Sequence, residues 1–128
     1  MDTMKTKVLK KTIIDEAAQA LLAAAPAGSR VILFGSHARG LAREDSDLDF
    51  LVVEPGTVNR FTESVRLRKS VDQALGSIVQ PVDVIVTDKE RFIRNATVPN
   101  TLAYEAATYG RVYEGEKEIL SHGTADSN

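Results

Sequence analysis

The sequence Val31-Ile-Leu-Phe-Gly-Ser-His-Ala-Arg-Gly40, followed directly by Leu41-Ala-Arg-Glu-Asp-Ser-Asp-Leu-Asp-Phe-Leu-Val-Val-Glu54, decides the fold. It predicts a short apolar strand, a Gly-Ser turn that leads into a brief helical segment, and a second apolar strand. The second strand begins with two carboxylates, Asp47 and Asp49. Because the side chains of a strand alternate between its two faces, these carboxylates point the same way. The stretch therefore predicts a rigid edge at which a metal ion can be held.

The composition is that of a small globular domain. The chain has 128 residues, 43% of them apolar and 27% charged, and we expect one domain over residues 1–114 with a polar, disordered tail over 115–128. Sixteen Lys and Arg against 18 Asp and Glu give a net charge of −2, so we expect no direct nucleic-acid binding. The absence of cysteine excludes disulfides, a thiol nucleophile and Cys-ligated zinc, which leaves oxygen ligands for any metal. No apolar stretch is long enough for a signal peptide or a membrane span, and we expect a cytoplasmic protein.

Two amphipathic helices are predicted on either side of the opening stretch. Apolar residues at three-and-four spacing predict the first over Thr12–Ala25, and Pro26 ends it. After the Pro55-Gly56 turn, the same spacing predicts a surface helix of about five turns from Val58 to Val79. Helices in these positions would cover a sheet.

The strand pattern predicts that this sheet is apolar on both faces. Val31–Phe34 and Leu48–Val53 are apolar runs, interrupted only by Asp49, and predict strands covered by helices on both sides. In a third strand, Val82–Val86, the valines share one face and Asp83 lies on the other. A carboxylate in the middle of an apolar strand is costly to desolvate unless it is paired or metal-bound. The predicted fold class is α/β (α+β), with a small mixed β-sheet flanked by helices.

The C-terminal part is predicted to hold two short helices and an edge strand. Thr87-Asp-Lys-Glu90 has the spacing of a capping box and begins a short helix through Arg94. The next helix begins near Pro99 and ends at Tyr109-Gly110, where glycine is the C-terminal stop. Its inward-facing residues are predicted to be Leu102, Ala103, Ala106 and Ala107. Arg111–Glu114 adds a last edge strand.

Three carboxylates carry the predicted chemistry. If the strands that hold Asp49 and Asp83 are neighbours, these two residues and Asp47 form a compact acidic cluster, which repels itself without cations. Magnesium prefers carboxylate and phosphate oxygens and usually completes its shell from the phosphates of a nucleotide. The cluster therefore predicts magnesium together with a nucleotide.

The turn that follows the first strand is the predicted phosphate site. Gly35 lets the backbone approach an anion closely, and Ser36 offers a hydroxyl and a backbone N–H near the start of a helical segment. Arg39 lies one helical turn further on and adds a fork of donors to the same phosphates. His37 is interpreted as a capping or packing residue, because no second histidine is near it. The triphosphate is expected between this turn and the acids.

Each feature also has a purely structural interpretation. Gly35-Ser36 alone is most often a plain turn, and Asp83 can be held by a backbone amide. Asp45-Ser-Asp-Leu-Asp49 alone can be a solvated acidic loop or the opening of a calcium loop. The calcium interpretation fails on spacing, because that loop needs glycine where this sequence has Phe50 and a bidentate Glu where it has Gly56. Only the combination points to a nucleotide site.

That combination resembles a known signature. Gly35-Ser36, ten intervening residues, Asp47-Leu48-Asp49 and the later Asp83 are similar to the signature of the DNA polymerase β-like nucleotidyltransferase superfamily. The resemblance extends from the first helix to Tyr113 and is strongest to the minimal nucleotidyltransferase (MNT) branch. It rests there on Gly35-Ser-His-Ala-Arg-Gly40 and Asp45-Ser-Asp-Leu-Asp49. It implies that Gly35 and Ser36 hold the β- and γ-phosphates and that Asp47 and Asp49 bind two Mg²⁺ ions. Asp83 would then complete the site at the ion that activates the incoming hydroxyl.

For the MNT branch, the resemblance implies a partner protein. The partner would be a HEPN-domain RNase toxin, and this chain would be its antitoxin, transferring AMP from ATP to a tyrosine hydroxyl of the toxin within a hetero-oligomer. Two alternatives remain open. One is a non-enzymatic antitoxin that neutralises its partner by binding alone, and the other is the catalytic subunit of a small-molecule nucleotidyltransferase of the aminoglycoside type. Nucleic-acid polymerisation fits least, because the chain is acidic and no template-binding region is evident.

Overall fold

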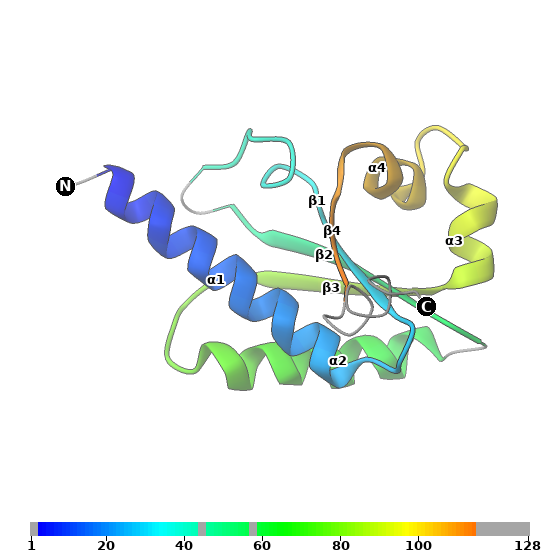
Figure 1. Ribbon diagram of the computed structural model, residues 1–128, viewed down its shortest axis with the longest axis horizontal. Helices are drawn as coiled ribbons and strands as arrows, with labels where there is room; N and C mark the ends of the chain where they lie inside the picture. The colour runs from blue at the N-terminus through cyan, green and yellow to red at the C-terminus, as the bar shows by residue number, and fades with distance from the viewer. Residues whose placement is uncertain (1–2, 44–45, 57–58, 115–128) are drawn as a thin grey trace, which may run out of the picture.

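The structure, a computed structural model, describes residues 3–43, 46–56 and 59–114, with side chains from Lys10 onward. This part of the chain contains helices and strands intermixed along the sequence (Figure 1). In chain order they are α1 (Thr3–Ala24), β1 (Arg30–Phe34), β2 (Leu48–Glu54), α2 (Arg60–Leu75), β3 (Val82–Asp88), α3 (Lys89–Asn95), α4 (Leu102–Tyr109) and β4 (Arg111–Tyr113).

The strands form one mixed sheet in the order β3-β2-β1-β4. β1 pairs antiparallel with both β2 and β4, whereas β2 and β3 run parallel. Because parallel neighbours need a crossover, α2 connects β2 to β3. The predicted fold class, a small mixed sheet flanked by helices, is confirmed, and so is the predicted edge strand after Gly110.

Helices cover both faces of the sheet (Figure 1). On one face, α1 and α2 enclose the larger core, whose biggest side chains are Leu21, Leu33, Leu48, Phe50 and Leu67. On the other face, α3 and α4 cover a smaller core, which contains Ile32, Phe34, Leu51, Val53 and Ala106. The long apolar strands follow from this burial, since every residue of β2 except Asp49 is buried.

Strand alternation determines which face carries the acids. Leu48, Phe50 and Val52 of β2 point to the core under α1 and α2, so Asp49 points to the side of α3 and α4. In β3, Val82 and Val86 point to the larger core, as predicted, and Asp83 points away from it. Both carboxylates therefore lie on the α3/α4 side.

The first two helices differ in length from the prediction. α1 begins at Thr3 rather than Thr12, because the lysine-rich residues before Thr12 lack apolar spacing but are good helix formers. α2 ends at Leu75 rather than Val79, because Gly76 adopts a φ of +61° and its N–H donates to the carbonyl of Asp72. Val79 follows the helix and is 94% exposed, so the predicted helix end at Val79 is wrong. Val58, the predicted start, lies outside the described residues.

The predicted helical segment after the Gly-Ser turn is wrong. Residues 36–40 form consecutive turns instead. The Arg39 N–H donates to the Gly35 carbonyl, four residues back, at 3.2 Å, which is the spacing of an α-helix. The Leu41 N–H instead donates to the Ser36 carbonyl, five residues back, at 2.9 Å, so the helical pattern does not continue. Glycines with φ of +78° and +73°, Gly35 and Gly40, bound the segment, which explains why no helix propagates.

The N-cap residues of the two short helices α3 and α4 also differ from the prediction. The N-cap of α3 is Asp88, whose carboxylate accepts from the Arg91 N–H at 2.7 Å, rather than Thr87. The N-cap of α4 is Thr101, whose hydroxyl accepts from the Tyr104 N–H at 3.1 Å. In α4 only Ala103 and Ala106 are buried, so the predictions that Leu102 and Ala107 point inward are wrong.

Gly110 ends α4 as predicted, but for a different reason. Its φ of −76° is open to any residue, so a left-handed conformation does not explain the glycine. A Cβ at this position would instead clash with the Ala106 carbonyl and the side chain of Ile32. Glycine is therefore required so that the chain can pass closely over β1 into β4.

The end of β2 carries one buried acid. Glu54 is only 1% exposed, and its Oε2 has no hydrogen-bond partner. Its neighbours on α2 are Glu63 and Arg66, and the Arg66 guanidinium donates to both carboxylate oxygens of Glu63 at 2.7 and 3.0 Å. Burial raises the pKa of Glu54 to about 7, aided by its hydrogen bond to Glu63. Glu54 is therefore largely protonated below neutral pH.

Within the described ranges, none of the helices combines the length and apolar character that a bilayer span requires. The predicted tail, residues 115–128, and the motif residue Asp45 lie outside the described residues.

Candidate active site

Asp49 and Asp83 are direct neighbours across the parallel strands β2 and β3. Each is the second residue of its strand, and the register pairs the two. A hydrogen bond of 3.0 Å from the Leu48 N–H to the Pro81 carbonyl sets this register. Because paired residues of a parallel ladder point to the same face, the two carboxylates lie side by side on the α3/α4 side. The strand arrangement on which the predicted acidic cluster depends is therefore present.

The electrostatics of Asp49 reflect this crowding. Its pKa is raised, first by burial and then by the negative charges of Asp83, Asp47 and Glu105. When Asp49 is protonated it hydrogen-bonds to Asp83, which raises the pKa further. Like charges at this spacing resist simultaneous ionisation unless a cation is present. The site thus favours either a proton or a metal ion.

Gly35 lies directly against Asp49. Phe34, the last residue of β1, is paired with Asp49 in the antiparallel register. A Cβ built on Gly35 would lie 2.5 Å from Oδ2 of Asp49. Only glycine lets the chain turn over this carboxylate with a φ of +78°. The half-buried Ser36 follows at once, so the predicted phosphate turn and the predicted metal ligand are adjacent.

Asp47 occupies a different position from its partners. It precedes β2 and is exposed, and it acts on Asp49 as a nearby charge. The segment leading to it is anchored at Ser46, whose carbonyl accepts from Nε2 of His37 and from the side-chain amide of Gln80, both at 3.2 Å. This bond requires the His37 tautomer that carries its hydrogen on Nε2. Through this hydrogen bond, His37 ties the Gly-Ser turn to the acidic segment.

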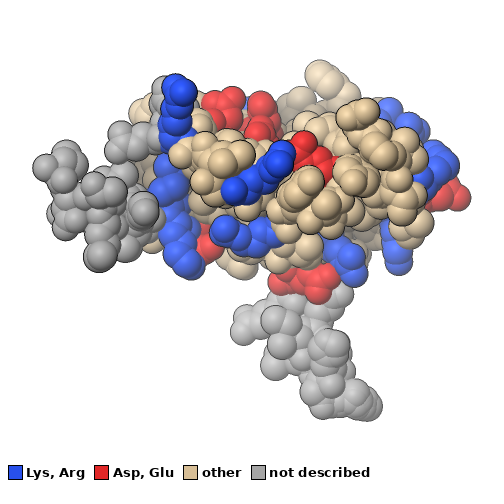
Figure 2. All heavy atoms as spheres, turned by 90° about the horizontal axis from the view of Figure 1, so that it is seen from above, with Lys and Arg blue, Asp and Glu red and all other residues tan. Residues whose placement is uncertain are grey.

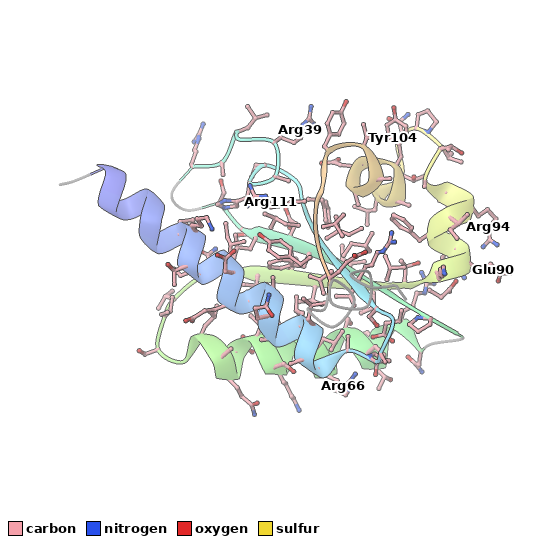
Figure 3. All side chains as sticks on the ribbon, in the orientation of Figure 1. Arg39, Arg66, Glu90, Arg94, Tyr104 and Arg111 are labelled. Atoms are coloured by element: carbon pink, nitrogen blue, oxygen red, sulfur yellow. The ribbon has the colours of Figure 1, made fainter. Side chains whose placement is uncertain are left out.

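The side chain of Arg39 contacts α4. Its guanidinium stacks on the ring of Tyr109 with 4.3 Å to the centroid, and both side chains are exposed. Figure 3 shows Arg39 and Tyr104 on the same side of the sheet, one from the loop after β1 and the other from α4. An exposed stack of this kind is weak, so Arg39 can turn toward a bound anion at little cost.

Two residues of the site were not predicted. Glu105, in the first turn of α4, adds a fourth negative charge near Asp49. Gln80, just before β3, also donates to the Pro81 carbonyl at 2.9 Å and so braces the start of that strand. Neither has a local sequence signal, because each reaches the site only through the packing of distant segments.

The donor set suits a hard divalent cation such as magnesium. The acids offer only oxygen ligands, which is the preference of a hard dication, and their mutual repulsion is relieved by positive charge. Among the described residues, no group of three or more His, Cys, Asp or Glu is already arranged around one point. Asp49 and Asp83 are paired in the strand register, and Asp47 is close enough to Asp49 to act on it as a charge. A cation and the phosphates it carries would draw the three together.

The charge on the upper face of the molecule is mixed. Figure 2 shows basic and acidic side chains interspersed on the face seen from above the sheet, where α4 and the loop after β1 lie. Such a surface offers local contacts to a small anion.

Comparison with known families agrees with this geometry. The family model of the nucleotidyltransferase domain matches residues 14–110, which include the Gly-Ser turn and all three acids. This chain belongs to the nucleotidyltransferase domain family. No curated protein sequence matches this nucleotidyltransferase domain at a significant level.

Two solved structures share the fold of this nucleotidyltransferase domain. A protein from Sulfolobus solfataricus assigned as a nucleotidyltransferase superposes with a TM-score of 0.59 at 19% identity, covering 90% of this chain and 88% of that one. A toxin–antitoxin structure with AMP-PNP superposes with a TM-score of 0.53 at 20% identity, covering 83% of this chain and 77% of that one. At these identities the similarity establishes the common fold.

Proposed function

We propose that this nucleotidyltransferase is a magnesium-dependent antitoxin that transfers AMP from ATP to a tyrosine hydroxyl of a HEPN-domain RNase toxin. The observation that carries the proposal is the register pairing of Asp49 with Asp83 directly under Gly35. It supports a site in which two carboxylates and a phosphate-binding turn face the same point. We further propose that the reaction takes place in the cytoplasm.

In this proposal each residue of the site has a defined role. Gly35 and Ser36 hold the β- and γ-phosphates through the turn, and Arg39 adds donors after leaving Tyr109. Asp47 and Asp49 would hold the magnesium ions, whose positive charge would neutralise the nucleotide phosphates. Asp83, on the outer strand, faces the incoming hydroxyl.

The transfer step follows from the chemistry of these groups. The acceptor oxygen forms a bond to the α-phosphorus, the bond between the α-phosphorus and the bridging oxygen breaks, and pyrophosphate leaves with the electron pair. The hydroxyl proton is released on the Asp83 side. Bound magnesium would activate the hydroxyl and neutralise the charge of the leaving pyrophosphate.

The toxin partner and the nucleotide are supported by similarity of fold. One structure that shares the fold is a toxin–antitoxin complex with AMP-PNP, an ATP analogue. We infer by analogy that this chain also binds ATP and a toxin. The resemblance of its Gly-Ser and Asp motifs to the MNT branch supports a HEPN-domain protein as that toxin.

Intact-mass spectrometry of the HEPN-domain partner after incubation with this chain and Mg-ATP tests the proposal. One or more adenylate additions are expected with the wild-type chain, and none with Asp47→Ala or Asp49→Ala. Glu16→Ala, an exposed acid on α1 remote from the site, is the matched control and is expected to behave as wild type.

Two outcomes would contradict the proposal. If the acid variants still neutralise the toxin and no mass is added, the chain is a binding antitoxin. If an aminoglycoside rather than the protein gains the nucleotide, the chain belongs to a small-molecule nucleotidyltransferase.

A further inference from the structure

β3 is an outer strand of the sheet, and part of its backbone faces away from β2. The described residues contribute no strand on its far side. Because the Pro81 carbonyl accepts from the Leu48 N–H, the backbone groups of Asp83 and Ile85 also face β2. Those of Val84, between them, face outward. Such an edge is a template for an added strand.

A groove runs between this edge and α2. Its volume is about 450 Å³, and its lining includes Asp83, Val84 and Ile85 from β3 and Val65, Arg68 and Lys69 from α2. In Figure 1, α2 runs alongside β3 over the length of the strand. We call this feature the β3 groove. It contains one of the three acids of the proposed active site.

The β3 groove has an apolar floor and a basic wall. Val84 and Ile85 are half-buried and Val65 is 43% exposed, so the floor is apolar. Arg68 and Lys69 are exposed and form a cationic wall. Arg68 also contacts Asp72 at 3.5 Å, but both side chains are exposed, so this ion pair is weak and exchangeable.

The apolar floor continues along α2 beyond the groove. Phe61 lies one helical turn before Val65 on the same side of the helix and is 79% exposed. Glu63 and Arg66, by contrast, pair with each other and do not line the groove. Apart from Asp83 and the small polar Ser64, the lining of the β3 groove is therefore apolar and basic.

We propose that the β3 groove binds the acceptor of the reaction as an extended, acidic segment of the partner chain. This inference rests on the proposed function and deepens it. The segment adds to the edge of β3 through the backbone groups of Val84 and places its acidic side chains against Arg68 and Lys69. Its hydroxyl residue lies at the Asp83 end, where the oxygen attacks the α-phosphorus and pyrophosphate departs. Main-chain pairing supplies affinity, and the cationic wall supplies specificity.

Reversal of the cationic wall tests the docking of the segment. In R68E/K69E the Kd for Mg-AMP-PNP is expected to stay at the wild-type value, while the KM for the HEPN-domain partner rises at least tenfold. K11E/R94E is the matched control, because it reverses two exposed cations outside the groove and changes the net charge equally. Equal KM values for R68E/K69E and K11E/R94E would overturn the inference.

Hydrogen exchange tests the added strand directly. The outward amide of Val84 is expected to gain at least tenfold protection when the catalytically blocked complex forms with the partner and Mg-AMP-PNP. Unchanged exchange at Val84 would overturn strand addition even if the charge reversal has an effect. Val84→Pro, which removes an outward N–H and no ladder bond, is expected to raise the partner KM without unfolding the sheet.

The two proposals fail in different ways. If the wild-type chain adds no adenylate to the partner, the proposed function fails. If the wild-type chain adds adenylate and R68E/K69E performs as well as K11E/R94E, only the β3 groove fails. If R68E/K69E loses affinity for a single-stranded RNA but keeps the wild-type partner KM, the groove binds nucleic acid and the inference is wrong.

Discussion

Asp49 and Asp83 stand at the same level of two parallel strands, with their carboxyl groups on one face of the sheet. The pKa of Asp49 is raised by burial and by the charge of Asp83, so the two groups destabilise each other when both are ionised. The arrangement therefore costs stability in the absence of a cation, which is common at functional sites.

Asp83→Asn is expected to increase the stability of the metal-free chain and to decrease its activity. Removal of one charge should increase the free energy of unfolding without metal by up to about 1 kcal/mol, the size of an interaction between partly exposed charges. Nucleotidyl transfer should fall by about a hundredfold or more. Urea denaturation and a transfer assay measure the two effects. Asp15→Asn, at an exposed ion pair on α1, is the control, and a destabilised Asp83→Asn would contradict the argument.

Magnesium with AMP-PNP is expected to raise the melting temperature of the wild-type chain. A ligand at about a hundred times its Kd adds about 2.7 kcal/mol to the free energy of unfolding. Asp49→Asn removes the negative charge of a carboxylate that is proposed to bind the ion, so the melting temperature of this variant should hardly respond. Differential scanning fluorimetry with calcium and magnesium in parallel measures this. Equal shifts in both proteins would show that the ions bind elsewhere.

Gly35→Ala is expected to abolish transfer, and Gly40→Ala is its matched control. Both glycines have positive φ, +78° and +73°, so both variants carry a backbone strain of about 1–2 kcal/mol. Only at Gly35 does the new methyl group meet Oδ2 of Asp49, at 2.5 Å, whereas nothing lies within 4 Å at Gly40. Gly35→Ala should therefore lose activity far beyond Gly40→Ala at similar stability, and equal losses would show that the contact with Asp49 is unimportant.

The strands of the fold could be predicted because their signal is local. The apolar run of β1 and the position of Asp83 opposite the valines of β3 both follow from alternation within a few residues. The ends of helices that depend on backbone conformation could not be predicted as well from the sequence. Gly76 ends α2 through a positive φ, and Gly35 and Gly40 prevent a helix after β1, although each glycine alone is compatible with either outcome.

The site could be predicted only in part, because part of it is assembled by packing. The Gly-Ser turn and the Asp-x-Asp pair are contiguous in sequence, and Asp83 was recognisable as a polar interruption of a strand. Glu105 and the stack of Arg39 on Tyr109 depend on where α4 crosses the sheet. No spacing rule gives that position, since it is set by long-range contacts.

Arg39→Ala is expected to weaken nucleotide binding about tenfold, which corresponds to the loss of one charge-assisted hydrogen bond to phosphate. Tyr109→Leu should change the Kd by less than about fivefold, because the exposed stack contributes only about 0.5–1 kcal/mol. Arg39→Lys should fall between these, since it keeps the charge but not the planar fork. Calorimetry with Mg-AMP-PNP measures all three. Wild-type affinity in Arg39→Ala would show that Arg39 serves the stack alone.

Glu54 should make the stability of the fold depend on pH. Its pKa is raised from 4.5 to about 7 in the folded state, mainly by burial, so the unfolded chain releases this proton at lower pH. The free energy of unfolding should therefore fall as pH rises from about 4.5 to about 7 and level off above that. The neighbouring Glu63 has the opposite effect on stability, because its hydrogen bond with Arg66 lowers its pKa in the folded state. The stability that Glu63 contributes is lost only as the pH falls below the pKa that Glu63 has in the unfolded chain.

Glu54→Gln is expected to remove the loss of stability at neutral pH, since the amide can donate to Glu63 as a protonated carboxyl does. At pH 7.5 the variant should exceed the wild type by on the order of 1–3 kcal/mol, and at pH 5 the difference should shrink toward zero. Urea denaturation followed by circular dichroism at both pH values measures this. Glu16→Gln, at an exposed site, should be neutral throughout. A Glu54→Gln variant that is less stable than wild type at pH 7.5 would mean that the buried carboxylate is compensated by Arg66.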